Sequence, residues 1–271
     1  MANTIFELKD VHFSYLGKYP ALRGIDIKIE KGQKIAVIGA NGSGKSTLLH
    51  MLDGLIFPER GSITAFGSAL NEDIFNDKVF SKDFRKKVGL VFQNPDVQLF
   101  CPTVKDDIIF GPLQLGIEEQ EIEKRLERLL AILNIKDLVN RPPHQLSIGE
   151  KRKVAIASTL IIEPEVLILD EPTAGLDPLT TRHIIDLLIE ENISGRTIIT
   201  STHDLHIVEE ISDTVYVFSH NKQIVKSGEP DSILKDAALL QANNLVHIHS
   251  HRHKDKIHIH SHIHLDHHAE G

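Results

Sequence analysis

A glycine-rich segment near the start of the chain restricts the possible fold more than any other feature. Residues 39–46 read Gly-Ala-Asn-Gly-Ser-Gly-Lys-Ser, after an apolar run at 34–38 and before a helix-forming run at 47–52. Glycines let successive backbone N–H groups curl around an anion, and the start of the following helix adds its positive end. A strand, this spacing and a helix together predict a phosphate-binding loop, with a nucleoside triphosphate as its ligand.

Two side chains of this loop have predictable tasks. Lys45 is expected to lie against the β- and γ-phosphates, and the hydroxyl of Ser46 is expected to hold Mg²⁺. The residues predicted to bind the triphosphate are Gly39, Ala40, Asn41, Gly42, Ser43, Gly44, Lys45, Ser46 and Thr47.

A second apolar run ends in two acidic residues. Residues 166–169 are Val-Leu-Ile-Leu, which is typical of a central parallel strand, and Asp170 and Glu171 follow directly. In phosphate-loop enzymes an aspartate at this strand end helps to hold Mg²⁺, and a following carboxylate can polarise water toward the γ-phosphate. With the phosphate-binding loop upstream, the pair indicates a site that hydrolyses a triphosphate.

Composition limits the classes of protein that need to be considered. The 271 residues include 30 basic and 38 acidic side chains, a net charge of −8 with no basic stripe, which argues against nucleic acid as the main partner. Cys101 is the only cysteine, so no internal disulfide is expected. The N-terminus lacks the features of a signal peptide, and no apolar run approaches the roughly 20 residues of a membrane helix. We therefore expect a cytosolic protein whose membrane role comes through a partner.

The order of the remaining patterns indicates an α/β fold. Alternating residues before the phosphate-binding loop predict an antiparallel sheet. The sequence from 94 to about 146 is helical in texture, with one apolar face formed by Ile122, Leu126, Leu129, Leu130 and Leu133. A helix over about 179–191 joins the buried strands 166–169 and 197–201 into a strand–helix–strand unit.

Four further motifs give the chain a resemblance to a known family. The sequence Leu-Ser-Ile-Gly-Glu at 146–150, Gln93, Ala-Gly-Leu-Asp at 174–177 and Ser-Thr-His-Asp at 201–204 match the signature, Q-loop, D-loop and switch histidine of ABC transporter ATPases. The resemblance covers nearly all of residues 4–235, and Tyr15 matches the aromatic residue that stacks on adenine. It implies a P-loop NTPase (RecA-like) α/β core with an antiparallel β subdomain and a helical subdomain at about 94–162, within an ATPase domain of residues 4–243.

The resemblance also implies a reaction and a second subunit. Two such subunits pair head to tail around two ATP molecules, and each ATP faces the other subunit's signature residues, here Ser147, Gly149 and Glu150, near the D-loop residue Asp177. The helix that follows the signature would place its N-terminus at the γ-phosphate. The residues implied in catalysis are Glu171, His203 and Gln93, and those implied in holding Mg²⁺ are Ser46, Gln93 and Asp170. Loss of the γ-phosphate would then open the dimer.

Two residues depart from the usual signature, Leu-Ser-Gly-Gly-Gln. Ile148 replaces a glycine, and Glu150 replaces the glutamine. A β-branched side chain or an added negative charge beside a triphosphate would weaken this half of the site. We favour the interpretation that Ser147 and the backbone of Gly149 make the contacts while Ile148 points away. The alternative is a heterodimer in which a second ATPase supplies the better signature.

Residues 92–112 narrow the resemblance to a subfamily. The sequence Phe-Gln-Asn-Pro-Asp-Val-Gln-Leu-Phe and its continuation to Pro112 are similar to the energy-coupling-factor ATPases of cobalt, nickel and vitamin uptake systems. In these systems the ATPase binds the coupling helices of a membrane protein at a surface next to its Q-loop. The resemblance implies a transmembrane coupling subunit and a substrate-capture subunit as partners, and a peripheral position on the cytoplasmic face of the cell membrane.

Histidines dominate the segment 244–271, which we expect to be a flexible tail. The candidate ligands for Ni²⁺ or Co²⁺ alternate with other residues and are His247, His249, His251, His253, His258, His260, His262 and His264. Neutral imidazole suits these ions and not Mg²⁺. Binding is expected near pH 7, with release below about pH 6.5 as the imidazoles take up protons. An inert low-complexity tail or a purification tag is the alternative.

An ATPase subunit for nickel or cobalt import is therefore the leading hypothesis, and a vitamin importer with an incidental histidine tail stays open. A GTP-dependent nickel chaperone would need an Asn-Lys-x-Asp guanine reader, and the only Asn-Lys pair continues as Gln-Ile. A soluble ABC protein of DNA repair or translation would need a basic face, a coiled-coil insert or a second cassette. The sequence leaves homodimer and heterodimer open.

Overall fold

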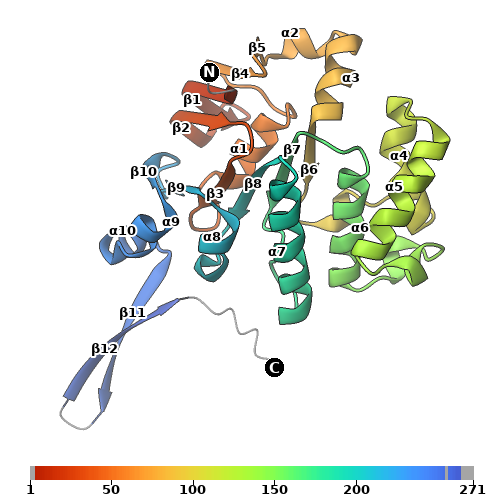
Figure 1. Ribbon diagram of the computed structural model, residues 1–271. Helices are drawn as coiled ribbons and strands as arrows, with labels where there is room; N and C mark the ends of the chain where they lie inside the picture. The colour runs from red at the N-terminus through yellow and green to blue at the C-terminus, as the bar shows by residue number, and fades with distance from the viewer. Residues whose placement is uncertain (1–3, 254–255, 264–271) are drawn as a thin grey trace.

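The computed structural model describes residues 4–253 and 256–263, and its central feature is a six-stranded sheet (Figure 1). The strand order is β10–β9–β3–β8–β7–β6, with every neighbouring pair parallel except the antiparallel β9–β10 edge. The strands are β3 (Lys34–Ile38), β6 (Val88–Val91), β7 (Val166–Asp170), β8 (Thr197–Thr202), β9 (Thr214–Phe218) and β10 (Ile224–Gly228). Strands β7 and β8 are buried along their whole length, as expected for strands that are covered on both faces.

The N-terminal part of the chain forms an antiparallel sheet of four strands, in the order β2–β1–β4–β5. Its strands are β1 (Thr4–Tyr15), β2 (Tyr19–Glu30), β4 (Arg60–Ala65) and β5 (Ser68–Ala69). Strand β1 is continuous although the alternation of apolar and polar residues breaks within it. The register against β2 shifts between Leu8 and Val11, and Asp10 has a φ of 46°, so a bulge absorbs the break in alternation.

The helices fall into groups around the sheets (Figure 1). Three of them, α4 (Val104–Leu115), α5 (Glu119–Ile132) and α6 (Ile148–Leu160), form the helical region beyond strand β6. The other helices are α1 (Lys45–Leu52), α2 (Glu72–Phe75), α3 (Lys78–Lys87), α7 (Pro178–Ile193), α8 (Leu205–Ile211), α9 (Pro230–Leu234) and α10 (Ala237–Ala242). Helices α9 and α10 are separate because Asp236 caps the second of them by accepting the backbone N–H of Leu239 at 3.0 Å.

The central sheet separates two large apolar clusters. Val166 and Ile168 of β7 pack in the cluster that holds α1 and the antiparallel sheet. Leu167 and Leu169 pack in the opposite cluster, which holds residues of α4, α5 and α6. Alternate side chains of one strand therefore bind the two halves together, and the carboxyl ends of β3, β7 and β8 meet at one edge of the sheet.

The chain ends in a two-stranded antiparallel hairpin that extends from α10 away from the rest of the protein (Figure 1). Its strands are β11 (Val246–His253) and β12 (Lys256–Ile263), and Val246 is buried at its base beside Leu245. The predicted metal ligand His264 lies outside the described residues. No helix in the described ranges is both long and apolar enough to cross a membrane.

Candidate active site

The phosphate-binding loop lies between β3 and α1, as predicted, and its backbone conformation depends on glycine. Gly42 and Gly44 have φ values of 72° and 115°. A Cβ atom on Gly44 would lie 2.4 Å from the carbonyl oxygen of Ala21, so both the backbone conformation and the neighbouring strand exclude a side chain there. The hydroxyl of Ser43 is buried and has no hydrogen-bond partner within the described part of the chain, as expected for a loop built around a polar ligand.

Lys45 is almost fully buried at the start of α1, and its ammonium group is held from two sides. It donates a 2.7 Å hydrogen bond to the carbonyl of Gly39 and lies 3.4 Å from Oε1 of Glu171. The Lys45 and Glu171 side chains are only 6% and 5% exposed. The sequence places these residues far apart, and the parallel pairing of β3, β8 and β7 brings them to the same edge.

Glu171 is strained and tightly bound. Its φ of 46° lies in the left-handed region, which is costly for a non-glycine residue and is characteristic of functional sites. Its Oε2 lies 2.8 Å from Nδ1 of His203, and its backbone N–H donates to the hydroxyl of Ser201 at 3.0 Å. Burial opposes ionisation of Glu171, but the hydrogen bond from His203 and the charge of Lys45 outweigh it and hold the pKa of the carboxyl below its usual value.

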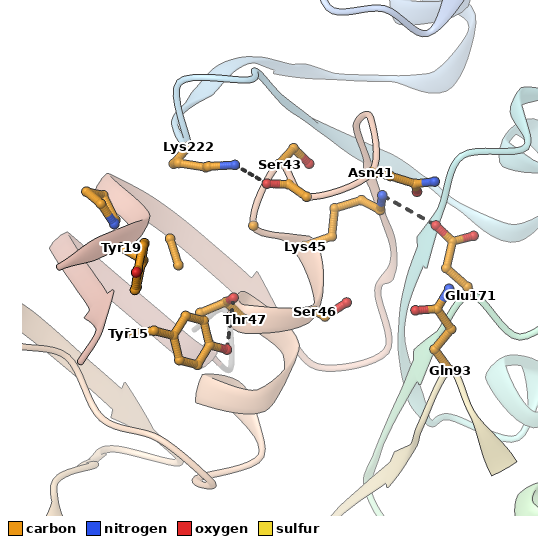
Figure 2. A pocket seen from close by; sticks show the side chains of 14 residues that line it. Tyr15, Tyr19, Asn41, Ser43, Lys45, Ser46, Thr47, Gln93, Glu171 and Lys222 are labelled. Carbon is orange, nitrogen blue, oxygen red and sulfur yellow. Dashed lines mark hydrogen bonds and ion pairs between the residues drawn. The ribbon is translucent and has the colours of Figure 1, made fainter. Parts of the chain in front are cut away.

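The donor set near this edge fits a magnesium ion. Asp170 ends β7, is 3% exposed and accepts a 2.5 Å hydrogen bond from Ser201. Ser46 and Gln93 line the same cleft as Glu171, whose buried Oε1 accepts no hydrogen bond from any described residue (Figure 2). Hydroxyl, amide and carboxylate oxygens are the hard ligands that Mg²⁺ prefers, so these residues match the predicted ion.

A cleft of about 380 Å³ joins the loop to the antiparallel sheet (Figure 2). The predicted residues that line it are Tyr15, Asn41, Gly42, Ser43, Gly44, Lys45, Ser46, Thr47, Gln93 and Glu171. The hydroxyl of Tyr15 lies 3.2 Å from Oγ1 of Thr47, and its ring is exposed toward the cleft entrance. Gly39, Ala40, Asp170 and His203 are predicted site residues that do not line the cleft.

Four further residues line this cleft, and the sequence analysis did not identify them: Tyr19, Pro20, Ala21 and Lys222. Tyr19 lies next to Tyr15, with which it pairs across β1 and β2, and Lys222 reaches the carbonyl of Gly42 from the turn between β9 and β10 (Figure 2). The backbone carbonyl of Lys222 also accepts the N–H of Arg23 at 2.9 Å. Because 180 residues separate Lys222 from Gly42, no local pattern could have predicted this contact.

The signature residues lie at the start of α6 and do not line the cleft of their own chain. Ser147 accepts the N–H of Glu150 at 3.3 Å, and the Glu150 carboxylate accepts the N–H of Ser147 at 2.7 Å, which is a capping box. These hydrogen bonds hold the pKa of Glu150 below its usual value. The side chain of Ile148 is exposed, and its 61% exposure shows that it does not fill the interior of its own chain.

The D-loop packs beside the signature. Asp177 is the N-cap of α7 and accepts the N–H of Thr180 at 3.0 Å. A Cβ on Gly149 would lie 3.5 Å from the side chain of Thr180 and 4.0 Å from that of Leu176. The D-loop and the signature therefore form one surface, which includes Ser147, Gly149, Glu150 and Asp177. This surface is separate from the cleft that holds the residues predicted to bind the chain's own nucleotide.

Known proteins are similar to this chain in sequence. The family model described as ABC transporter matches residues 22–174. The nickel import ATP-binding protein NikO of Rhodobacter capsulatus is 50% identical over 244 residues, which cover 89% of this chain and 95% of that protein. The energy-coupling factor transporter ATP-binding protein EcfA of Methanocaldococcus jannaschii is 44% identical over 241 residues, 89% of this chain and 85% of that protein.

Solved structures agree with this relationship. The cbiO1 protein of Clostridium perfringens, described as part of the transporter complex cbiONQ, superimposes with a TM-score of 0.75 at 37% identity, over 90% of this chain and 95% of that chain. A dimeric ATP-binding cassette bound to ADP and phosphate superimposes with a TM-score of 0.75 at 26% identity, over 83% of this chain and 99% of that chain. With the phosphate-binding loop, the strand-end carboxylates and the signature helix in the arrangement described above, the chain belongs to the ATP-binding subunits of ABC transporters and is an ATPase.

Proposed function

We propose that this chain is the ATP-hydrolysing subunit of an energy-coupling-factor importer for nickel or cobalt ions. The observation that carries the ATPase part is the series Lys45–Glu171–His203 beside the nucleotide cleft, in which Lys45 and Glu171 are buried. The substrate part is supported by the name of the 50% identical NikO protein and by the histidines after residue 246.

The geometry supports different roles for these residues in hydrolysis. Glu171 stays ionised at neutral pH because its pKa is lowered, so it accepts hydrogen bonds from an attacking water and orients it. His203 fixes the carboxylate through Oε2 and leaves Oε1 on the side of Lys45. Ser46, Asp170 and Gln93 would hold Mg²⁺, which would supply charge stabilisation to the phosphate oxygens. Lys45 neutralises the β- and γ-phosphates once they replace Glu171 as its partner.

A second ATPase subunit completes the site in this proposal. The hydroxyl of Ser147 accepts the N–H of Glu150 and keeps its own proton free to donate to a phosphate oxygen. The exposed side chains of Ser147 and Ile148 lie at the N-terminus of α6, where the helix dipole favours an anion. A head-to-tail dimer, homomeric or heteromeric, would bring this surface over the nucleotide cleft of the other subunit.

A groove beside the Q-loop suits a membrane partner. It has a volume of about 310 Å³ and lies between the end of α1, strand β6 and helices α4 and α6. Of the large apolar side chains that line it, Leu55 and Phe110 are exposed. The exposed ring of Phe100 packs against that of Phe110, and Leu113 is exposed on α4. An apolar groove of this kind fits a short amphipathic helix, as a transmembrane coupling subunit would supply. This partner, with a substrate-capture subunit, would hold the ATPase on the cytoplasmic face of the cell membrane.

The histidine hairpin is the proposed binding site for Ni²⁺ or Co²⁺. The backbone register pairs His247 with His262, His249 with His260 and His251 with His258. Because successive positions of a strand alternate between its two faces, this register assigns these six histidine positions to one face of the ladder. Bound metal would let the tail buffer or sense the imported ion, with release below about pH 6.5.

A composition-matched variant tests this arrangement in the full chain. Exchanging neighbours in β12 (Ile257→His, His258→Ile, Ile259→His and His260→Ile) keeps every histidine but moves two of them to the other face. We expect Ni²⁺ affinity, measured by calorimetry at pH 7.5, to fall about tenfold or more. An unchanged affinity would show that histidine content alone binds the metal, and no affinity in either chain would refute the metal site.

Transport by the assembled complex tests the proposed substrate. The complex, purified with its membrane partners and placed in proteoliposomes, should hydrolyse ATP faster when Ni²⁺ or Co²⁺ is present on the capture side. Stimulation by a vitamin and not by either metal would favour the alternative, a vitamin importer of the same type.

A further inference from the structure

The Q-loop segment, defined here as residues 92–98, is bonded to the signature helix α6 through a buried arginine. Arg152 is 2% exposed, and no other fully buried side chain among the described residues is larger. Its Nη1 donates a 2.7 Å hydrogen bond to the carbonyl of Phe92, and its Nη2 donates a 2.6 Å hydrogen bond to the carbonyl of Gln93. One planar guanidinium group therefore fixes two successive peptide units of the segment.

Gln98 strengthens the connection from the other end of the segment. Its Oε1 accepts the backbone N–H of Phe92 at 3.2 Å, and its Nε2 donates to the carbonyl of Ala155 in α6 at 2.9 Å. Further out, Lys151 pairs with Asp96 at 2.7 Å. Both polar backbone groups of Phe92 are thus bonded to side chains that are anchored on α6, so the segment has little freedom to move without that helix.

We propose that Arg152 is a positioning residue that fixes Gln93, in the subunit's own nucleotide cleft, to the helix that carries Ser147. This inference rests on the proposed roles of those two residues. Gln93 lines the cleft beside Ser46 and Glu171, whereas Ser147 caps α6 and is directed to a second subunit's nucleotide. A shift of Gln93 on Mg²⁺ binding is transmitted through the guanidinium group to α6, which links the two ATP sites of a dimer.

The environment of Arg152 explains why an arginine is needed here. Among the described residues no carboxylate pairs directly with it, and a buried cation without such a partner is costly. Burial lowers the pKa of Arg152, and the charges of Asp170 and Glu171 counteract that effect. Lysine would keep the charge but has no planar fork, so it could not bond both carbonyls in this geometry.

A double-mutant cycle on ATP hydrolysis by the full chain tests the proposal. We expect Arg152→Lys to raise the Mg²⁺ concentration for half-maximal activity about tenfold, the range for residues that orient metal ligands. The Hill coefficient for ATP should fall toward 1. In a Gln93→Ala background the same substitution should add nothing to the Mg²⁺ dependence, because its effect passes through Gln93.

Arg125→Lys is the matched control. Arg125 is also partly buried in the helical region and donates to a main-chain carbonyl, that of Ile161 at 3.1 Å, but it lies away from the Q-loop segment. It should leave the Mg²⁺ dependence unchanged. If Arg152→Lys does not fold, judged by thermal unfolding, Gln98→Met tests the same connection from the side of Phe92.

Two results would overturn the inference, and a third concerns the proposed function. If Arg152→Lys changed the Mg²⁺ dependence equally in the native and the Gln93→Ala backgrounds, the arginine would only stabilise the fold. Unaltered Mg²⁺ dependence in Gln93→Ala would remove the role that Arg152 is proposed to support. Absence of ATP hydrolysis in the unmodified chain, alone and with its membrane partners, would instead refute the proposed function.

Discussion

The two halves of the candidate site differ in how completely a single chain forms them. In the phosphate-loop half, Lys45 and Glu171 are buried and already bonded to each other and to neighbours. In the signature half, Ser147 and Ile148 are exposed, and the side chain and N–H of Ser147 are hydrogen-bonded to Glu150 in the first turn of α6. One half is thus preorganised within the chain, and the other presents an exposed surface that we propose to be completed by a second subunit.

This difference separates two tasks in the proposed function. In that proposal, nucleotide binding depends on the backbone and the charges around Lys45, which one chain provides. Stabilisation of the γ-phosphate charge is proposed to depend on the N-terminus of α6, whose signature residues do not line the chain's own cleft. The predictions below test this division, beginning with the largest expected effect.

The phosphate-loop half should lose hydrolysis but keep binding when the charge of Glu171 is removed. Glutamine has nearly the same shape as glutamate, but it cannot act as a general base toward the attacking water. In the Glu171→Gln variant kcat should therefore fall about 10³-fold. ATP affinity, measured with a fluorescent nucleotide, should be unchanged or higher because Lys45 loses a competing anion. A kcat within tenfold of the unmodified protein would contradict the role of Glu171.

The signature half should also lose hydrolysis and keep binding, but through the nucleotide of a second subunit. Ser147→Ala removes a donor that acts on another subunit's nucleotide, so kcat should fall about 100-fold while ATP affinity of a single subunit stays the same. A mixture of Ser147→Ala and Glu171→Gln subunits should regain activity, because one of its two composite sites contains both native residues. Failure of the mixture to exceed either variant alone would contradict the proposed head-to-tail pairing.

The sequence predicted those elements of the phosphate-loop half whose geometry is local. The glycine spacing, the helix start at Lys45 and the strand end at Asp170 are each encoded within a few residues. The contacts of Lys222 with Gly42 and of Arg152 with Phe92 join distant segments, and no periodicity or motif marks them. Likewise, the apolar residues of α3 pack through Phe84 against a core that only the tertiary structure defines, so this helix was not predicted.

The boundary between the halves contains a buried acid whose ionisation should oppose folding. Asp53 ends α1 in the groove beside the Q-loop, is 5% exposed and lies 3.7 Å from Arg85. Burial raises its pKa to about 7, and Arg85 only partly counteracts this. Because the folded state then binds a proton that the unfolded state releases near pH 4, stability contributed by the neutral acid is lost as pH rises toward 7.

Asp53→Asn should remove this dependence. Relative to the unmodified protein, the free energy of unfolding of the variant should increase by about 2 kcal/mol between pH 5.5 and pH 8, measured by urea unfolding. The matched control is Asp83→Asn, an exposed acid on α3 paired with Lys87, which should show no such trend. A constant difference between Asp53→Asn and the unmodified protein at both pH values would show that Asp53 is ionised throughout.

The smallest effect concerns Glu150, the acid that departs from the usual signature. Its carboxylate accepts the N–H of Ser147 in the capping box, and glutamine can make the same bond. Glu150→Gln should therefore change the free energy of unfolding by less than about 0.5 kcal/mol, whereas Glu150→Ala should lower it by about 1 kcal/mol. If Glu150→Gln also raises kcat severalfold, the added charge weakens the signature half; if kcat is unchanged, the carboxylate serves only to cap α6, and the departure from the usual signature costs this ATPase nothing.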